Sequence, residues 1–464
     1  MTTDHEWILP KSNPFTNIPR SNQLCLSDKD EELTWNDVAD EVNNWREIYK
    51  KEGITKGMRI TIISDTSTEC WIACLAASGM GISPGFCSPS QTDIERDIRI
   101  KVSNSNAVID FRDDTIKHIH DKKSCLAETE LAWWQGAGTS GNFTMAPVMW
   151  GHDENYKGNQ PMIQPFPWML ESLLSKPVIT INWCHPYTAI SPDIMYTNFL
   201  LGGHAHVIKD KEEYDEASWK YKPNYLHSFP LGYALILESS KNPYNNTTSC
   251  SAVGSAWTKK LRNELTNKLG VQNFYNSYGN CEFSYLTFDA TGKKPETIGQ
   301  PFPWDKMKTW IDPVTNQVCT QGVHTGGEVK KIDDLVDMDW KFIGRPDTSM
   351  YVLRKQAKIW CEDIEAIAGQ FVDKVFVFGY DDKLYVSYIG NITPEELQEK
   401  LTLRPHQQPD IYWQLDKSFN EENLPGYAGK VVRRSIYDYI KKNPEYLVAS
   451  IDSTPGIKDL TSFT

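Results

Sequence analysis

Apolar and polar positions along the chain predict strands and helices in turn. Apolar runs at residues 58–64 and 177–183 are typical of buried strands, whereas the run at 69–79 and the leucine spacing of 257–269 are typical of helices. The same pattern predicts a helix over 33–49, with Thr34 as its N-cap and Asp37 three positions later, and strands over 107–110 and 205–208. A further apolar run at 131–135 ends in a glycine-rich turn. Such an alternation favours an α/β fold in which a parallel sheet is covered by helices.

The pattern changes twice toward the C-terminal end. Near Ile298 the apolar segments become shorter and are separated by turns, as expected for a small β unit. A compact last unit follows from Gly344. Its predicted elements are a helix over 359–369, a hairpin of strands 374–378 and 384–389, and a helix that begins with Thr393 as N-cap.

Composition and charge narrow the functional classes. The 464 residues include 48 Lys and Arg against 61 Asp and Glu, a formal net charge of −13, which argues against a protein that coats nucleic acid or an anionic membrane. No segment approaches the roughly 20 apolar residues that cross a bilayer, and the N-terminus has neither a basic start nor an apolar core. The ten cysteines include no CxxC pair, and Cys70 and Cys74 fall on one helix face as small apolar residues. We therefore expect a reduced, cytoplasmic protein without a membrane span.

A glycine-rich segment, Gly136–Gly141, directly follows the apolar run 131–135. Its glycines let backbone amides approach a phosphate, and Thr139 and Ser140 add hydroxyl donors. The segment also fits the dinucleotide pattern GxGxxG, but Pro147 interrupts the stretch that follows and no suitable acidic residue lies near position 160. A phosphate loop, a nicotinamide-dependent oxidoreductase and a plain turn are the interpretations that this segment leaves open.

Three further segments carry residues that suit phosphate chemistry. Tyr278–Glu282 combines an aromatic ring, which can stack on a base, with a carboxylate, which can hold a metal ion. Leu424–Arg434 places Lys430 on a turn, from which it can swing into a site as a point charge. Gly344–Asp347 is typical of a hinge. Each segment also has a purely structural interpretation, namely a strand end with a surface glutamate, a solvated loop lysine and an interdomain turn.

Taken in order, these segments resemble those of the adenylate-forming superfamily, which contains acyl-CoA synthetases, peptide-synthetase adenylation domains and luciferases. The resemblance runs from about Leu33 to Tyr437. The matching segments are Gly136–Gly141 with the phosphate loop TSGTTGxPK, Tyr278–Glu282 with YGxTE, Thr297–Pro301 with IGxP, Gly327–Val329 with GEL, Gly344–Glu365 with GRxD…EIE, and Leu424–Arg434 with LPxTxxGKxxRR. Because all the matches occur in the same order, coincidence is a poor explanation.

The resemblance implies an α/β fold in two parts. Residues 1–343 would form a large N-terminal adenylating domain of two α/β subdomains plus a small β-barrel around 298–343. Residues 344–464 would form a small mobile α+β C-terminal domain that carries the catalytic lysine. The active site would then lie at the junction of the two domains.

Members of the superfamily convert a carboxylic acid and Mg-ATP to an acyl-adenylate, release pyrophosphate, and pass the acyl group to a thiol or an amine. The resemblance therefore implies ATP and Mg²⁺ as cofactors, a small-molecule carboxylic acid as substrate and CoA as the expected acceptor, with a carrier-protein thiol or an amine as the alternative. The residues that it assigns are Gly138, Thr139, Ser140 and Gly141 on the β and γ phosphates, Tyr278, Gly279 and Cys281 at the nucleotide, Glu282 on Mg²⁺, Arg345 on the ribose or phosphates, Asp347 as the hinge, and Lys430 between the carboxylate and the α-phosphate.

The sequence departs from the family pattern at several positions. Thr144 stands where the family usually has lysine, which weakens the expected grip on pyrophosphate, and Cys281 replaces a threonine that donates to the α-phosphate. The aspartate that chelates the ribose hydroxyls is best matched by Asp334, with Asp337 as its substitute. Gln356 stands where a glycine lets pantetheine pass, so adenylation is better supported than transfer to CoA.

Two positions bear on the acid. Gly279 stands where acetate-specific members place a tryptophan that closes the acyl pocket, which favours an acid larger than acetate. His185 resembles a position that lines the acyl pocket in the family, and a satisfied core histidine is an equal alternative. The sequence has no match for the acidic residue with which amino-acid-activating domains hold the substrate amine.

Two other classes of function compete with adenylation. A metal-dependent hydrolase would use the pairs in His118–His120 and His204–His206, each on one face of a strand, although no HExxH motif is present. A non-catalytic nucleotide- or acyl-binding descendant of the fold would explain the departures from the family pattern. The chain keeps Glu282, Arg345 and Lys430 together. This argues for an enzyme, because a site without activity has no reason to keep a metal ligand and a mobile cation.

Overall fold

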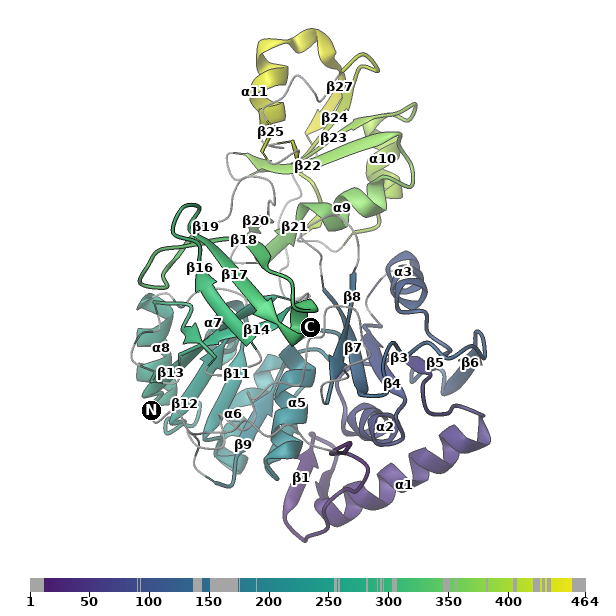
Figure 1. Ribbon diagram of the computed structural model, residues 1–464, viewed down its shortest axis with the longest axis vertical. Coiled ribbons are helices and arrows are strands. Elements are labelled where there is room, and N and C mark those ends of the chain that lie inside the picture. The colour runs from purple at the N-terminus through teal and green to yellow at the C-terminus, as the bar shows by residue number, and fades with distance from the viewer. Residues whose placement is uncertain are drawn as a thin grey trace. The chain divides into compact units, whose positions relative to one another are not determined.

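The computed structural model describes residues 12–452 except for a set of segments, which are 90, 92, 137–143, 151–173, 175, 189, 254–256, 258, 281–282, 290, 293, 295, 303–306, 345–350, 355–356, 381–382, 404–406, 420–425, 428–429 and 432–434 (Figure 1). The described residues divide into two compact units. The first unit draws on Met1–Gly136, Met145–Ile332 and Val336–Phe342, and the second on Ala137–Thr144, Asp333–Leu335 and Ile343–Thr464.

A four-stranded sheet with the order β2-β1-β10-β9 lies in the first unit. Its strands are β1 (Leu24–Ser27), β2 (Glu32–Thr34), β9 (Ile179–Asn182) and β10 (His204–Val207), and the helices against it are α1 (Trp35–Lys51), α5 (Ile190–Leu200) and α6 (Tyr214–Tyr221). β10 runs parallel to both β1 and β9, whereas β2 is antiparallel to β1. The capping of α1 is as expected, because Asp37 N–H donates to Thr34 Oγ1 and Thr34 N–H donates to Asp37 Oδ2 at 2.8 Å.

The second sheet of this unit has the order β11-β12-β13-β14-β15. Its strands are β11 (Tyr225–Ser228), β12 (Ser249–Ala252), β13 (Asn273–Asn280), β14 (Ser284–Phe288) and β15 (Gln300–Pro301), and its helices are α7 (Pro230–Ser239) and α8 (Lys259–Leu269). The first three strands are parallel, and β14 and β15 turn back antiparallel. β11 lies beside β9, where the Ile179 N–H donates to Asn224 Oδ1 at 2.9 Å.

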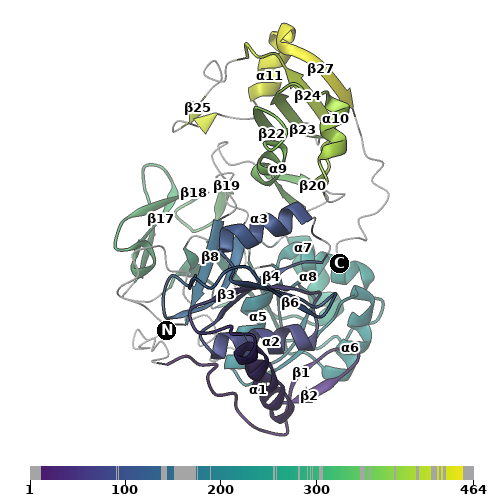
Figure 2. The same ribbon diagram turned by 90° about the vertical axis from the view of Figure 1, so that its right-hand side faces the viewer.

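A third sheet has the order β4-β3-β5-β6, and a separate pair, β7-β8, lies next to it with β7 beside β4. The strands are β3 (Arg59–Ile63), β4 (Ser83–Cys87), β5 (Ala107–Asp110), β6 (Thr115–His118), β7 (Glu130–Gly136) and β8 (Thr144–Met149), and the helices are α2 (Thr68–Gly79) and α3 (Asp93–Ser103). β3 is parallel to β4 and to β5. The parallel core and its covering helices confirm the predicted α/β class, and α2 lies alongside α1 in both views (Figures 1 and 2).

A buried ion pair joins β3 to the start of β7. Arg59 Nε lies 2.6 Å from Glu130 Oε1 and Arg59 Nη2 lies 2.9 Å from Glu130 Oε2, with side chains that are 3% and 0% exposed. Arg59 Nη1 also donates to the Ser103 carbonyl, and Glu130 Oε2 accepts from the Leu126 N–H. The two charged groups thus form a bidentate pair, with two parallel hydrogen bonds, as is typical of strong arginine–carboxylate interactions.

The shorter apolar segments that begin near Ile298 correspond to a four-stranded sheet with the order β16-β17-β18-β19. The strands are β16 (Met307–Ile311), β17 (Gln317–Gly322), β18 (Lys330–Val336) and β19 (Phe342–Gly344). This sheet is the expected small β unit, and its closure into a barrel stays a prediction. The segment Gly327–Val329, which resembles a family strand, instead lies in the turn before β18, where Gly326 and Gly327 have φ angles of +64° and +83°.

The second unit is built on a sheet with the order β22-β23-β24-β27. Its elements are β20 (Tyr351–Arg354), β21 (Ala357–Trp360), α9 (Cys361–Ala368), β22 (Lys374–Tyr380), β23 (Lys383–Ile389), α10 (Pro394–Lys400), β24 (Ile411–Leu415), β25 (Gly426–Tyr427), β26 (Lys430–Val431), α11 (Ser435–Lys442) and β27 (Leu447–Asp452). α9 and α10 cover one face over an aliphatic core, and α11 covers the other over an aromatic core (Figure 1). No helix in the described part of either unit is long and apolar enough to cross a membrane.

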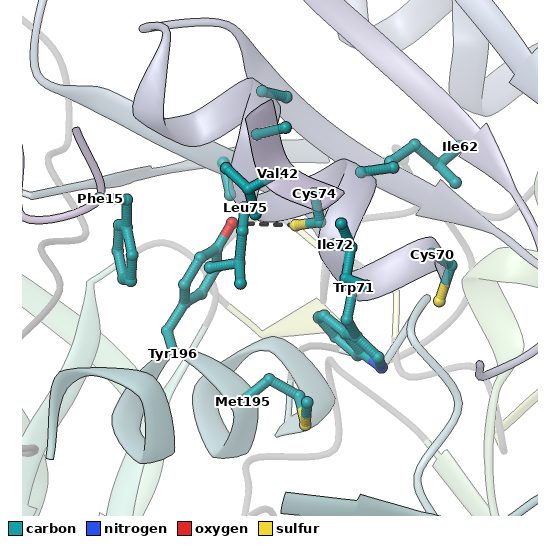
Figure 3. Close-up of a cluster of buried hydrophobic side chains, with 14 of the residues drawn as sticks. Phe15, Val42, Ile62, Cys70, Trp71, Ile72, Cys74, Leu75, Met195 and Tyr196 are labelled. Carbon is teal, nitrogen blue, oxygen red and sulfur yellow. Dashed lines mark hydrogen bonds between the residues drawn. The ribbon is translucent and has the colours of Figure 1, made fainter. Parts of the chain in front are cut away.

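The largest core of the first unit lies between α1, α2 and α5 (Figure 3). Cys70 and Cys74 are both buried there, as predicted, and Tyr196 on α5 points its hydroxyl at Cys74 Sγ, 3.1 Å away. Burial raises the pKa of Cys70 to about 11 and that of Cys74 to about 12, so both remain neutral thiols at neutral pH. None of the nine cysteines in the described part of the chain is in a disulfide.

Candidate active site

Most of the site residues expected from the motifs fall outside the described residues. These are Gly138, Thr139, Ser140, Gly141, Cys281, Glu282, Arg345, Asp347 and Gln356. Their assigned roles stay predictions. The structure does describe the strands that lead into these segments, together with Tyr278, Gly279, His185 and Asp334 and the backbone of Lys430.

The glycine-rich segment lies between the ends of β7 and β8. Upstream of it, Trp133 on β7 donates from Nε1 to the Ile60 carbonyl at 3.2 Å. A Cβ at Gly85 on β4 would come within 2.0 Å of the Trp133 ring, so only glycine lets the two strands approach this closely. This contact and the Arg59–Glu130 pair hold β7 in place, and β7 sets where the chain enters the glycine-rich segment.

Tyr278 and Gly279 lie at a bulge in β13. Tyr278 pairs with Thr287 on β14 and Gly279 pairs with Tyr285, with a register shift between them. Tyr278 is half-buried and packs against the core under β13 and β14. A bulge re-aims side chains at the end of a strand, which suits a ring that has to face a ligand.

A half-buried carboxyl group, that of Asp193, contacts the strand that pairs with this bulge. The Tyr285 hydroxyl donates to Asp193 Oδ2 on α5, which joins the strand opposite Gly279 to the helix that follows the His185 loop. Burial raises the pKa of Asp193 to about 7, and the hydrogen bond from Tyr285 partly opposes this rise. The sequence held no signal for this group, because an aspartate near a helix start is usually a solvated residue.

Asp193 should make the stability of the protein fall with rising pH. The native state holds a proton at Asp193 up to about pH 7, whereas an unfolded aspartate loses it near pH 4, so the native state binds more protons between these values. The free energy of unfolding therefore falls as the pH rises through this window. Asp193→Asn keeps an acceptor for Tyr285 and should raise the unfolding free energy by up to a few kcal/mol at pH 8, with little change at pH 4. Urea unfolding of both proteins at pH 4, 6 and 8 checks this, and equal pH dependence would contradict it.

His185 lies in the loop between β9 and α5. Its ring stacks on that of Tyr187, with centres 5.2 Å apart and planes at 29°. The Thr188 N–H and Oγ1 both donate to the His185 carbonyl, at 3.0 and 2.7 Å, so the loop backbone is fixed locally. The half-buried position of His185 is compatible with the acyl-pocket role, which stays a prediction.

The two aspartates proposed for the ribose occupy different settings. Asp334 is buried in β18. Asp337 Oδ1 accepts from the N–H groups of Asp339 and Lys341, each at 2.9 Å, in the turn before β19. That oxygen of Asp337 is committed to the turn, and the ribose role of both aspartates stays a prediction.

Lys430 begins β26, the second strand of a small hairpin in the second unit. It pairs with Tyr427 on β25 across residues 428–429. The role of Lys430 as a mobile catalytic cation stays a prediction.

The histidine pairs proposed for a metal serve other contacts. His204 Nε2 and His206 Nδ1 on β10 each lie 2.8 Å from Ser27 Oγ on β1. Burial lowers the pKa of both histidines to about 4, so they are neutral partners of one hydroxyl. His120 instead contacts the side chains of Asn104 and Asn106. Within the described parts of the chain, no group of three or more His, Cys, Asp or Glu residues is placed to hold a metal ion.

No protein-family model matches the chain. Among curated proteins, a hybrid PKS-NRPS synthetase, opdA of Penicillium oxalicum, is 28% identical over 141 residues. This stretch is 30% of the chain, and the chain spans only 3% of the length of that synthetase.

Solved structures match almost the whole chain. o-Succinylbenzoate CoA synthetase (MenE) of Bacillus subtilis, solved with a product analogue, covers 90% of this chain and 96% of its own, with a TM-score of 0.69 and 14% identity. MatB of Rhodopseudomonas palustris, solved with ATP, covers 93% and 99%, with a TM-score of 0.58 and 13% identity. Coronafacic acid ligase of Pectobacterium brasiliense covers 95% and 100%, with a TM-score of 0.55 and 13% identity. MenE has also been solved with an acyl-adenylate intermediate.

The chain has the fold of these adenylate-forming ligases. At such low identities the likeness establishes the fold, and it confirms the resemblance and the α/β class inferred from the motifs. Sequence patterns did not predict two contacts near the candidate site, Trp133 with Gly85 and Tyr285 with Asp193. In both, the partners lie far apart along the chain. A glycine inside a strand was the one available signal, since it marks a close approach of another group.

Proposed function

We propose that the chain is an ATP- and Mg-dependent ligase that converts a carboxylic acid to an acyl-adenylate, with release of pyrophosphate, and then passes the acyl group to CoA. The observation that carries this proposal is the fold, which matches a CoA synthetase over 90% of the chain. The order of the motifs along the chain supports it independently.

The proposal assigns the nucleotide to the segments that directly follow β7 and β13. Backbone amides of 138–141 would hold the phosphates and Tyr278 would stack on adenine. Magnesium prefers oxygen ligands and is usually held by one or two carboxylates together with substrate phosphates, so the carboxylate of Glu282, two residues beyond β13, fits it chemically. When bound, the ion would neutralise part of the phosphate charge.

The second unit would supply the mobile cation. Lys430 on the β25–β26 hairpin would contact both the attacking carboxylate and the α-phosphate, where negative charge builds during in-line attack. Arg345 would hold the ribose or phosphates, Asp334 the ribose hydroxyls, and Asp347 would act as the hinge. A lysine on a mobile domain can leave after the first step, so that the acceptor can enter.

Gln356 stands where the family has a glycine that lets pantetheine pass, and a side chain there would narrow that path, so a carrier-protein thiol or an amine is the alternative to CoA. The distinction is experimental, because the adenylation step is common to all three acceptors.

The test is pyrophosphate release from ATP and Mg²⁺ against a panel of carboxylic acids larger than acetate, each run with and without CoA. We expect release with at least one acid, and a higher steady-state rate when CoA is added. Release that CoA does not stimulate would reject CoA as the acceptor and retain the adenylation. If no acid of the panel gave pyrophosphate release although the protein bound ATP, the result would favour a non-catalytic descendant of the fold.

A further inference from the structure

A hydrogen bond connects strand β14 to helix α5 in the first unit. The Tyr285 hydroxyl on β14 donates to Asp193 Oδ2 in the first turn of α5, 92 residues earlier in the chain. The ring of Tyr285 is buried in the core under β13 and β14. A tyrosine hydroxyl can donate to a carboxyl group in either protonation state, because each state has a free acceptor oxygen. The contact therefore holds whether Asp193 is charged or neutral.

At its helix end, this contact is joined to the loop that carries His185. Ser191 lies two residues before Asp193, and its Oγ donates to the Cys184 carbonyl at 2.8 Å. The same Oγ accepts from Asn182 Nδ2 at the end of β9, at 2.9 Å. The start of α5 and the backbone next to His185 are thus bonded to each other, so a shift of Asp193 would also move the loop.

At its strand end, the contact lies opposite Gly279. Tyr285 pairs directly with Gly279 across β13 and β14, and directly paired residues of antiparallel strands face the same side of the sheet. Gly279 has no side chain, so the Tyr285 ring is the side chain that this pair presents there. β13 itself is held on both sides, by β12 and by β14.

A hydrogen bond fixes this arrangement more closely than apolar packing does. Ile194, Met195 and Phe199 pack α5 against the rest of the unit, but the hydrophobic effect is non-directional and tolerates small shifts. A hydrogen bond instead weakens steeply outside a narrow range of distances and angles. The Tyr285–Asp193 bond therefore sets where the start of α5 lies relative to Gly279.

We propose that Asp193 and Tyr285 are positioning residues that hold the His185 loop in place against Gly279, so that the acid is aligned with the nucleotide. The inference rests on the proposed function, since it takes His185 and Gly279 as parts of the acyl pocket. Neither positioning residue touches the reacting atoms. Their effect arises because a misplacement of about 1 Å between reacting groups can cost about 100-fold in rate.

Substitutions that remove the hydrogen bond test the kinetic consequence. In ATP–pyrophosphate exchange with the best acid, Tyr285→Phe should raise the KM for the acid by about 10-fold, because it loses a hydrogen bond to a carboxyl group. The KM for ATP should stay within about twofold, since β13 is held by its neighbours and the loop is the part that shifts. An unchanged KM for the acid would overturn the proposal.

Two variants of Asp193 separate the hydrogen bond from the shape of the side chain. Asp193→Asn keeps an acceptor for the Tyr285 hydroxyl, and its KM for the acid should stay within about twofold of the unsubstituted protein. Asp193→Leu removes the acceptor and should behave as Tyr285→Phe does. If Asp193→Leu fails to fold, Asp193→Asn combined with Tyr285→Phe serves instead and should show no more than the effect of Tyr285→Phe alone. A larger combined effect would mean that the two residues act separately, which would contradict the proposal.

Tyr49→Phe is the matched control. Tyr49 is a fully buried tyrosine of the same unit, and its hydroxyl donates to the Ala73 carbonyl at 2.9 Å, which joins α1 to α2. Loss of this hydroxyl should lower the free energy of unfolding and leave the KM for the acid unchanged. An equal rise of that KM in Tyr49→Phe and Tyr285→Phe would show general loosening of the unit and overturn the proposal.

Amide hydrogen exchange separates this inference from the proposed function. Peptides that cover residues 183–188 should exchange faster in Tyr285→Phe than in the unsubstituted protein, and should be unchanged in Tyr49→Phe. Faster exchange there in a protein that activates no acid would retain the hold on the loop and reject adenylation. Acid activation with an unchanged KM for the acid in Tyr285→Phe would do the reverse. Unchanged hydrogen exchange of the loop would show that the inference is wrong, whatever the activity.

Discussion

Replacing Lys430 by alanine should lower the rate of acyl-adenylate formation by about two to three orders of magnitude and leave the fold intact. The lysine lies on a two-strand hairpin and pairs through its backbone with Tyr427, a pairing that alanine can keep. In the proposed mechanism the ammonium stabilises charge that develops on the α-phosphate, which no neutral side chain can replace. ATP–pyrophosphate exchange with the best acid measures the effect.

Lys442→Ala is the matched control for this prediction. Lys442 is an exposed lysine at the end of α11 in the same unit, and its loss should change the exchange rate less than about twofold. If Lys430→Ala retained near-normal exchange, the catalytic assignment of Lys430 would be wrong. An equal loss in both variants would point to a general effect of charge instead of a role in the site.

Glu130→Ala should produce the largest loss of stability among single substitutions considered for the first unit. It leaves Arg59 buried at 3% exposure without its carboxylate, and breaking a buried ion pair by removing one partner costs about 3–5 kcal/mol. The Leu126 N–H loses its acceptor as well. Chemical denaturation followed by tryptophan fluorescence measures the change in the free energy of unfolding.

Two residues away, Glu128 provides the comparison. Its carboxylate is 84% exposed and lies 3.5 Å from the exposed Lys56, and such surface pairs contribute about 0–1 kcal/mol. Glu128→Ala should therefore be close to neutral. Similar losses in both variants would contradict the view that the buried pair fixes the start of β7.

Sequence patterns predicted those elements whose signals are local. The strand 107–110 coincides with β5, and Thr34 and Thr393 cap α1 and α10 as expected. These elements are determined by an apolar run or by a capping residue close in sequence. The same local signals were sufficient for the alternation that defines the α/β class.

The predicted boundaries of strands and helices were wrong where contacts between strands lengthen or shorten an element. The predicted hairpin strands continue until Tyr380 pairs with Lys383, although the residues between look like a loop. The Tyr380 ring stacks on Tyr437 of α11 with centres 3.7 Å apart, which favours the longer strand. The predicted helix 359–369 begins at Cys361, because Ile359 pairs with Val352 in β20–β21.

The residues of the candidate site also fall into those that local sequence signals predict and those that only the fold brings into contact. Motif residues such as Lys430 and Tyr278 could be named from the sequence, because glycines and charged residues at fixed spacing carry the signal. Asp193 could not, since its interest lies in its contact with Tyr285, which only the fold provides.

The most direct test of adenylation is the fate of the carboxylate oxygen. The best acid of the panel is labelled with ¹⁸O in its carboxyl group and incubated with the protein, ATP, Mg²⁺ and the acceptor, and the nucleotide product is analysed by mass spectrometry. Because the carboxylate attacks the α-phosphate and the acyl group then leaves, we predict AMP that carries one ¹⁸O atom. ADP with ¹⁸O in inorganic phosphate, or AMP without label, would contradict the account.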